Sequence, residues 1–509
     1  MSTRRIATCL PFLLWGIALA ALIVGSKQVW QFTADDSFIT FRYSSNLIAG
    51  HGLRFNQIGA PVEGYTSILW VLIMAIPHLA GGGVVTFAKA FGVICMAGAA
   101  MLIAWMVDQY HSERVPAWLR QIGAGIAAFF FCVLPETSVH AVSGMETAIS
   151  TFLITLLAVF ISALRSGSNK VLILFCFTAL LAGLARPEAN LSIIMLIAWI
   201  AWKWNSPNRY RFLLAAGFLY VVPGCVYFLW RWQYFGILFP LPFYVKAGGG
   251  GLPGFGAVLA FLIFVLGSFG LYIGIGTFAP AQRTFPLWLI ILPQLIFFNF
   301  SEPVMGYDHR FLYPYLPVLV ILSGYGVNRL LSEVYKYNRG KTWLCLGMSL
   351  LILSVFAAPN VQRTGSLFDH KNAYANGLLK NHIAIGNILR SIPHTAEAPI
   401  LLVSDAGAAP YFSGWRTLDA NKLTEPALVF STVDPLDYLF AHHPAVVMLM
   451  SNDLQEFIND SAYARSIYER AISEGLVPVR KRAFYQLDFI WALARPDTPE
   501  AFALEQSIK

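Results

Sequence analysis

The run VVTFAKAFGVICMAGAAMLIAWMV at positions 84–107 decides the class of fold, because its one charged residue is Lys89. A helix needs about 20 apolar residues to cross the hydrocarbon core of a bilayer. Four further runs have similar length and composition: 6–25, 212–230, 258–280 and 342–358. Charged residues make up 12% of the chain, against roughly 25% in soluble proteins. These features predict a polytopic α-helical membrane protein.

Weaker apolar runs complete a predicted set of eleven crossings: 121–134, 147–164, 171–184, 191–202, 284–300 and 311–327. If the N-terminus is cytoplasmic, the inner loops hold 14 Lys and Arg residues and three acids, whereas the outer loops hold seven Lys and Arg residues and eight acids. This asymmetry follows the positive-inside rule. If the stretch 65–80 crossed the membrane, every later loop would change sides and the positive-inside rule would be violated. We therefore expect this stretch to lie at the outer interface, with Tyr65 and Trp70 as interfacial aromatic residues. No small-residue cleavage site precedes Lys27, so the first run is expected to be a retained helix.

The composition changes after residue 358. Residues 359–509 contain 16 of the 27 acids and 13 of the 35 basic residues. Their patterns predict helices at 373–391 and 460–474 and strands at 399–404, at 444–450 and near 476–492. We therefore predict a transmembrane domain, 1–358, and a water-exposed α/β domain, 359–509, on the outer face.

Cysteine spacing and charge exclude some classes of site. The six cysteines lie in apolar runs, and none has the CxxC spacing of a zinc or redox site. Basic residues do not cluster with aromatic residues in a polar segment, so the sequence does not favour a nucleic-acid partner. The partner that it does predict is the lipid bilayer.

The first outer loop begins ADDSFITFRYSSN, with Asp35 and Asp36 just after the first helix. A carboxylate fixed and partly desolvated at a helix end can act as a general base toward a hydroxyl group. Two adjacent acids can also bind a divalent cation, or cap a helix that begins at Ser37. All three interpretations stay open at this point.

Other ionisable and polar residues lie in the remaining outer loops. They are Glu63, Glu136, His140, Glu146, Arg186, Glu188, Arg231, Tyr244, Lys246, Asp308, His309 and Arg310. Charged groups near a bilayer are costly and tend to be functional. We expect these groups to gather on one face, where the cations would hold a phosphate in the headgroup layer. The alternative is a web of structural ion pairs.

Short motifs over nearly the whole chain resemble a known family. They are ADDSFITFRYSSN, GHGLRFN, PVEGYTSILW, SGMET, ARPE, YFG, PFYVK, GYDHRFLYPYLP and VSDAGAAPYFSGWRTLDA. The chain resembles the polyprenyl-phosphate-dependent glycosyltransferases of the GT-C superfamily, and among them the mycobacterial terminal arabinofuranosyltransferase group and pilin arabinosyltransferases. Ala189 fits only loosely the glycine or other small residue that usually follows RPE or RPD in relatives. At Leu241-Pro242 the chain departs from the Pro-Asn that relatives often have.

The resemblance implies a lipid-linked donor and a set of site residues. An acid of the first outer loop would be the base, Asp35 or Asp36 here, with Glu63 as a second acid. Cations near the phosphate would be Lys246 and Arg310, joined by Arg231 or His309.

The leading hypothesis is transfer of a sugar, such as D-arabinofuranose, to a glycan or pilin-like protein acceptor. It places the reaction at the outer face of a bacterial inner membrane. This hypothesis requires no cofactor, and it leaves open whether a divalent cation is bound. One alternative is a transporter or flippase of lipid-linked sugars, with Lys89 on its path, but no inverted repeat is evident. Another is a non-catalytic assembly protein whose outer domain binds a partner.

Overall fold

The computed structural model describes residues 3–110, 116–164, 168–204, 207–246, 251–337, 341–393 and 399–506, with side chains from position 10 onward. Several residues that enter the counts of inner-loop charges and cysteines lie outside this part of the chain: the side chains of Arg4, Arg5 and Cys9, and the inner-loop residues Glu113, Arg114, Arg165 and Arg339.

The chain forms two compact units, which we describe separately. The helical unit comprises Met1–Trp30, Ala88–Leu229 and Gly249–Phe368. The mixed unit comprises Gln31–Phe87, Trp230–Gly248 and Asp369–Lys509. The predicted limits 1–358 and 359–509 follow composition, and they stay a prediction.

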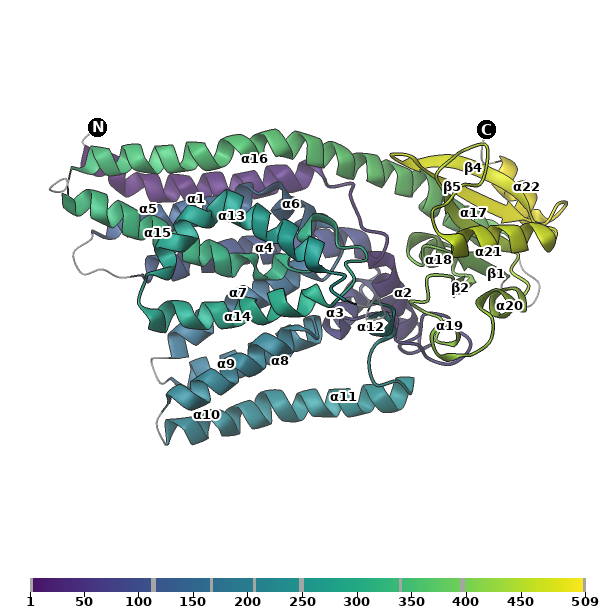
Figure 1. Cartoon of the computed structure of the whole chain (residues 1–509), viewed down its shortest axis with the longest axis horizontal. Helices are drawn as coiled ribbons and strands as arrows, with labels where there is room; N and C mark the ends of the chain where they lie inside the picture. Colours follow the sequence, from purple (N-terminus) through teal and green to yellow (C-terminus); the bar gives the residue numbers. More distant parts are fainter. Residues whose placement is uncertain are drawn as a thin grey trace. The chain divides into compact units, whose positions relative to one another are not determined.

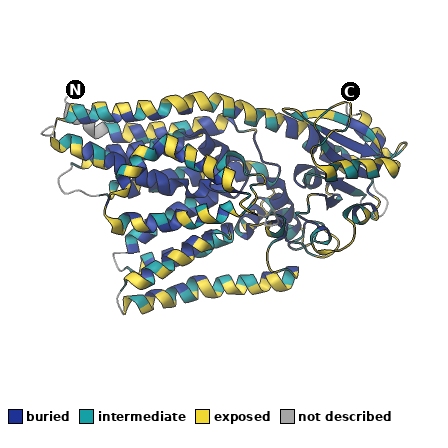
Figure 2. Cartoon of the chain, viewed as in Figure 1, coloured by how far each residue is buried: buried dark blue, intermediate teal, exposed yellow. Residues whose placement is uncertain are grey.

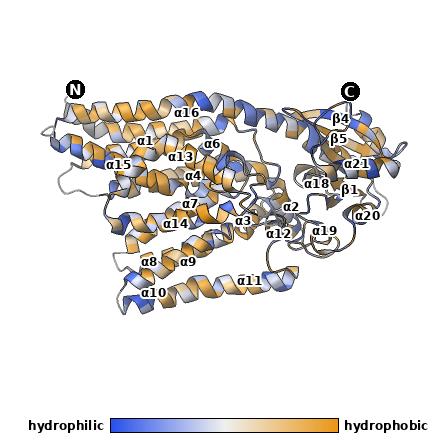
Figure 3. Ribbon diagram, in the orientation of Figure 1, coloured by the Kyte–Doolittle hydropathy of each residue, from blue (hydrophilic) through white to orange (hydrophobic). Residues whose placement is uncertain are grey.

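The helical unit consists mainly of apolar helices (Figures 1 and 3). They are α1 (Thr3–Gln28), α4 (Val84–Asp108), α5 (Ala117–Val133), α6 (Pro135–Val142), α7 (Thr147–Ala163), α8 (Asn169–Ala185), α9 (Ala189–Lys203), α10 (Asn208–Ala216), α11 (Val222–Phe235), α13 (Phe255–Thr277), α14 (Ala281–Asn299), α15 (Leu316–Tyr337) and α16 (Thr342–Leu378), with α4, α11 and α16 continuing into the mixed unit. A π-helical turn, η2 (Gly217–Val221), joins α10 to α11.

The helices confirm a polytopic membrane protein. Within the described ranges, six helices are long and apolar enough to cross a bilayer, or seven if α5 and α6, bent by 61°, form one span. Each predicted apolar run overlaps a helix. The remaining apolar helices are shorter, so the count of eleven crossings stays a prediction.

Glycines allow two of these helices to approach closely. A Cβ on Gly276 of α13 would collide with the backbone carbonyl of Leu322 in α15, and one on Gly326 of α15 with that of Tyr272. Small residues at such contacts are typical of helix packing in membranes. Large apolar side chains remain exposed elsewhere, as along α11 (Figure 2), where lipid would cover them.

The first two segments of the mixed unit contain the helices α2 (Ser37–Ile48), α3 (Ile68–Leu79) and α12 (Leu241–Lys246). The helix predicted within 65–80 is α3. Its 12 residues rise about 18 Å, short of the ~30 Å hydrocarbon core. This length agrees with the interfacial interpretation, and its placement at the outer surface stays a prediction.

The sheet of this unit has five strands in the order β2-β1-β3-β5-β4. They are β1 (Ile400–Val403), β2 (Arg416–Asp419), β3 (Val446–Ser451), β4 (Val477–Tyr485) and β5 (Asp488–Ala494). β1 runs parallel to β2 and β3, and β5 runs antiparallel to β3 and β4. The strands carry the buried core seen in dark blue in Figure 2.

The predicted α/β character of this region is confirmed. The predicted helices correspond to the end of α16, the π-helical turn η5 (Leu379–Ile383) and α17 (Ala384–Ser391), and to α21 (Ala462–Ser473). Sequence patterns missed β2 and four short helices: α18 (Ala408–Ser413), α19 (Ala427–Phe430), α20 (Pro435–Phe440) and α22 (Pro499–Gln506). Each is eight residues or shorter, too short to show a clear period.

Arg42 of α2 joins the first loop segment to the sheet region of the same unit. Its buried guanidinium donates to the carbonyl oxygens of Phe55 (2.6 Å), Trp415 (2.7 Å) and Pro410. Arginine suits such a site because its rigid fork presents five donors. Burial lowers the pKa of Arg42 to about 10.

Candidate active site

Asp35 lies between α1 and α2 and is only 6% exposed. The backbone N–H of Ala408 donates to its carboxylate over 2.8 Å. Its own backbone N–H donates to the hydroxyl oxygen of Tyr374 over 3.3 Å. Ala408 begins α18 and Tyr374 belongs to α16, so Asp35 is held by segments more than 330 residues away.

Gly407 makes this close approach possible. A Cβ at position 407 would collide with the backbone oxygen and the carboxylate of Asp35. A glycine is therefore required at this point of the turn between β1 and α18. The sequence DAG at 405–407 contains that glycine, but its partner cannot be found from the sequence.

A buried histidine, which sequence reasoning missed, acts on Asp35. His382 Nε2 lies 3.4 Å from Oδ2 of Asp405, and the charges of both residues influence the ionisation of Asp35. His382 belongs to η5, and π-helical turns within α-helices frequently occur at functional sites. Asp405 stands in a motif quoted above, directly after the predicted first strand, and that position was the available signal.

This environment changes the acidity of Asp35. Burial raises the pKa of its carboxyl from 3.8 to about 6. His382 opposes the shift, Asp405 and Asp36 add to it, and the hydrogen bond from Ala408 lowers it. A carboxylate whose pKa lies nearer neutrality is a better general base than a solvated aspartate.

Asp36 has a different position. It directly precedes α2, which begins at Ser37 as predicted, but its side chain makes no capping hydrogen bond. The capping interpretation of the acidic pair is therefore wrong for Asp36. Among the described residues, no group of three or more His, Cys, Asp or Glu side chains is arranged to hold a metal ion.

Glu63 and Arg231, both predicted to bind substrate, form a buried ion pair. Arg231 Nε lies 2.9 Å from Oε2 of Glu63, and its Nη1 donates to the carbonyl oxygen of Leu238 over 2.6 Å. Burial raises the pKa of Glu63, and Arg231 opposes that shift. The backbone oxygen of Glu63 also accepts from the N–H of Leu241, the first residue of α12. The pair thus anchors the start of α12.

The short helix α12 carries two further predicted site residues. Tyr244 accepts a hydrogen bond from the backbone N–H of Phe239 over 3.3 Å, and its ring contacts Phe430 edge-on at 5.0 Å. Lys246 is the last residue of the helix and is partly exposed. Both therefore belong to the same unit as Asp35 and Glu63.

In the helical unit, four predicted residues form one buried cluster. Arg186 Nη1 lies 3.2 Å from Oε1 of Glu146, and Arg310 Nη2 lies 3.6 Å from the same oxygen. Arg186 also pairs with Glu188. Both guanidinium groups lie over the ring of Phe311, 5.5 Å from its centroid. The cluster brings two cations and two acids together, as the ion-pair interpretation predicts.

Three residues of the last predicted outer loop have a strained backbone conformation. Asp308 and His309 have φ values of 48° and 61°, and Met305 has 57°. Non-glycine residues in this left-handed region are uncommon and cluster at functional sites. The main-chain oxygen of Asp308 lies 2.9 Å from Nε2 of His140, and the His309 ring stacks on Phe264 at 5.0 Å.

His309 also lines a hollow of about 610 Å³ between α13 and α16. Its lining is mostly apolar and includes Phe264, Tyr272 and Phe356, with Arg363 beside His309. Arg363 pairs with the buried Glu136. Sequence reasoning noted Glu136 but missed Arg363, because it lies in a polar stretch after the last predicted crossing.

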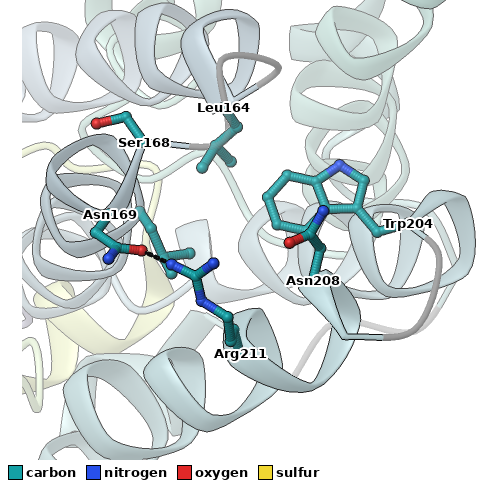
Figure 4. A pocket seen from close by; sticks show the side chains of 7 residues that line it. Leu164, Ser168, Asn169, Trp204, Asn208 and Arg211 are labelled. Carbon is teal, nitrogen blue, oxygen red and sulfur yellow. Dashed lines mark hydrogen bonds between the residues drawn. The ribbon is translucent and has the colours of Figure 1, made fainter.

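Two other polar features lie elsewhere in the helical unit. Lys89 is buried and donates to the carbonyl oxygen of Trp30. A small pocket forms at the ends of α7 to α10, where Arg211 donates to Asn169 and Trp204 lies opposite (Figure 4). No predicted site residue lines this pocket, whose residues come largely from predicted inner loops.

Comparison with known proteins agrees with the motif resemblance. No protein-family model matches the chain. A curated relative is the terminal β-(1→2)-arabinofuranosyltransferase of Mycobacterium tuberculosis, 29% identical over 254 residues. The match covers 47% of this chain and 39% of that protein, so the chain spans well under two thirds of the length of the relative it matches.

Solved structures give a match over almost the whole chain. The crystal structure of ArnT from Cupriavidus metallidurans bound to undecaprenyl phosphate superposes with a TM-score of 0.63 over 97% of this chain and 98% of that one, at 13% identity. The chain has the ArnT fold. The apo ArnT structure gives a TM-score of 0.58 at 14% identity, over 94% and 97% of the two chains. The resemblance to GT-C membrane glycosyltransferases is thereby confirmed.

Proposed function

We propose that this protein is a membrane glycosyltransferase that moves a sugar from a polyprenyl-phosphate donor to a hydroxyl group of an acceptor, with Asp35 as the general base. The observation that carries the proposal is the buried Asp35 carboxylate, oriented by the N–H of Ala408 and set beside His382 and Asp405. The ArnT fold supports the donor class, because ArnT has been crystallised with undecaprenyl phosphate.

The proposed reaction is a single displacement at the anomeric carbon. Asp35 accepts the proton of the acceptor hydroxyl while its oxygen bonds to that carbon. The bond from the carbon to the phosphate oxygen breaks, and polyprenyl phosphate leaves with both electrons. We assign Lys246 and Arg310 to neutralise the charge that grows on the phosphate. Glu63 and Arg231, which anchor α12, would keep Lys246 in place.

The donor's prenyl chain requires an apolar surface. The hollow between α13 and α16, about 610 Å³, has a mostly apolar lining that also includes the basic residues His309 and Arg363. We propose that part of the prenyl chain lies there. Burial lowers the pKa of His309, which favours its neutral form beside the apolar lining.

The sugar, acceptor and location are finer parts of the proposal. The mycobacterial relative is named for arabinofuranose transfer, so we propose D-arabinofuranose as the sugar and a glycan or protein as the acceptor. We place the reaction at the outer face of the inner membrane, with the N-terminus cytoplasmic and residues 359–509 extracytoplasmic, from the loop charges. The displacement itself balances without a cofactor.

Turnover of defined donors by the full chain in proteoliposomes tests this function. We expect release of polyprenyl phosphate from a polyprenyl-phosphate D-arabinofuranose donor and no release of nucleotide from a nucleotide sugar. Turnover of the nucleotide sugar alone would overturn the donor class. Addition of EDTA tests the divalent cation separately, since a loss of turnover that Mg²⁺ restores would assign it a role.

A further inference from the structure

The pocket at the ends of α7 to α10 has room for only a small polar group. Its volume is about 100 Å³, whereas sites for whole small molecules occupy roughly 300–1,000 Å³. The polar side chains of its lining are Ser168, Asn169, Asn208 and Arg211, and the Trp204 ring adds an aromatic wall. Its volume equals that of roughly three water molecules in the liquid. A larger ligand would therefore place one small group inside and keep the rest of its body outside.

Contacts between the helices fix the walls of this pocket. Arg211 of α10 donates to the side-chain oxygen of Asn169, the first residue of α8 (Figure 4). Arg209 Nε donates to the carbonyl oxygen of Trp204 over 3.0 Å, and the Trp204 ring packs edge-on against Phe212 at 5.5 Å. These contacts connect the ends of α8, α9 and α10, so the walls keep their places without a ligand.

Arg211 has donors to spare for an anion. A guanidinium group carries five N–H donors in a planar fork that matches the oxygens of a phosphate. Among the residues that the structure describes, Arg211 bonds to Asn169 through Nη2. The side chain is exposed, so its remaining donors can reach a group that enters the pocket from the surface.

The surroundings of the pocket are basic. Three further basic residues lie at the same helix ends: Lys170, Lys203 and Arg209. Between positions 147 and 301 the chain has one acid, Glu188. Glu188 precedes α9, at the end opposite Lys203, and it pairs with Arg186. Four cations thus gather where their own segments supply no acid, and such a surface attracts anions.

An exposed apolar surface begins one turn beyond Arg211. Leu214 and Phe218 follow it at spacings of three and four residues and are both exposed, so they continue the same side of the helix. Trp202 and Tyr210, also exposed, lie beside the basic residues, and such aromatic residues are enriched at the level of the lipid headgroups. A phospholipid has the same order of groups, a charged headgroup followed by acyl chains. A free phosphate would leave the apolar surface uncovered.

We propose that this end of α8 to α10 binds an anionic phospholipid, with the headgroup phosphate in the pocket at Arg211 and an acyl chain along Leu214 and Phe218. The loop charges place this lipid in the inner leaflet. The proposal is independent of the proposed transferase function, because none of the residues assigned to transfer lines the pocket.

Native mass spectrometry of the full chain in detergent tests the binding, with phosphatidylglycerol as the probe. Phosphatidylcholine with the same acyl chains is the comparison, because its headgroup has no net charge. We expect the wild type to bind phosphatidylglycerol more tightly. Arg211→Gln should weaken phosphatidylglycerol binding about fivefold, the effect of one basic residue at an anionic lipid surface, and leave phosphatidylcholine binding unchanged. Equal binding of the two lipids by the wild type would overturn the proposal.

Arg329→Gln is the matched control. Arg329 is also exposed, lies in a predicted inner loop and donates to a carbonyl oxygen, that of Phe278, over 2.8 Å. The control removes the same charge and should bind phosphatidylglycerol as the wild type does. Equal weakening in both variants would show an effect of net charge and overturn the site. Displacement of the lipid by inorganic phosphate at constant ionic strength would assign the pocket to a free anion. Displacement by equimolar polyprenyl phosphate would assign it to the donor, and either result refutes the proposal.

Discussion

Replacing Asp35 by Asn removes the proposed base and changes little else. Asparagine has the same size and keeps an oxygen that can accept from the N–H of Ala408, 2.8 Å away in the wild type. General-base catalysis contributes about 10²- to 10⁴-fold to a rate. We therefore expect kcat for sugar transfer at pH 7 to fall by about that factor, with little change in the KM for the donor.

The pH dependence gives the same prediction a second test. With a pKa of about 6, about nine tenths of Asp35 is ionised at pH 7 and about one tenth at pH 5. Wild-type transfer should therefore fall roughly tenfold between these values. The residual rate of Asp35→Asn should stay flat over the same range, since the titrating group is gone.

The folding stability should change with pH in the direction opposite to the transfer rate. Because the carboxyl pKa is raised in the folded state, from 3.8 to about 6, the folded protein binds this proton more tightly than the unfolded chain. The contribution of Asp35 to the free energy of unfolding is therefore full below pH 3.8 and falls by about 3 kcal/mol as the pH rises through 6. Asp35→Asn should be more stable than wild type at pH 7 and similar at pH 4.

Labelled donor in proteoliposomes measures transfer, and thermal unfolding in detergent measures stability. Asp36→Asn is the matched control for the transfer rate at pH 7, because it removes the adjacent acid. Since the charge of Asp36 raises the pKa of Asp35, the acid limb of this variant should lie at slightly lower pH than that of the wild type. The reasoning is refuted if Asp35→Asn transfers sugar at the wild-type rate, or if it retains the acid limb near pH 6.

Three further substitutions test the surroundings. His382→Gln removes a charge that lowers the pKa of Asp35, so the acid limb of the pH–rate profile should move to higher pH; an unchanged limb would contradict this. Gly407→Ala would force a Cβ into the Asp35 carboxylate and should cost about 1–3 kcal/mol of stability, measured by thermal unfolding, together with most activity; a wild-type melting curve would contradict it. Arg310→Gln removes one of the two guanidinium groups described beside Glu146 and should raise the KM for the lipid donor, whereas equal KM values would exclude Arg310 from donor binding.

The sequence predicted those parts of the structure that depend on local composition. Hydropathy identified the membrane helices because each is a continuous apolar run. Loop charge and position indicated Asp35, and the ARPE and SGMET motifs indicated Arg186, Glu188 and Glu146, which the structure brings together.

Long-range contacts could not be predicted in this way. The partners of Asp35 come from positions 374, 382, 405 and 408, and no spacing rule connects them to it. Nor did the sequence indicate that Arg231 pairs with Glu63, a pairing that anchors the start of α12. The expected convergence of all outer-loop groups on one face stays a prediction, because they divide between the two units.

The buried guanidinium of Arg42 has a consequence for biosynthesis. Its acceptors on Pro410 and Trp415 lie 368 and 373 residues later in the chain. At translation rates of about 5–20 residues per second, the ribosome delivers them roughly 20 to 70 s after Arg42 itself. During that interval Arg42 would lack its acceptors on Pro410 and Trp415, and the first loop would stay exposed to proteases and chaperones. Truncations that remove the last hundred residues should thus destabilise the earliest-made loop, and the nascent chain should gain protease resistance there only near the end of synthesis.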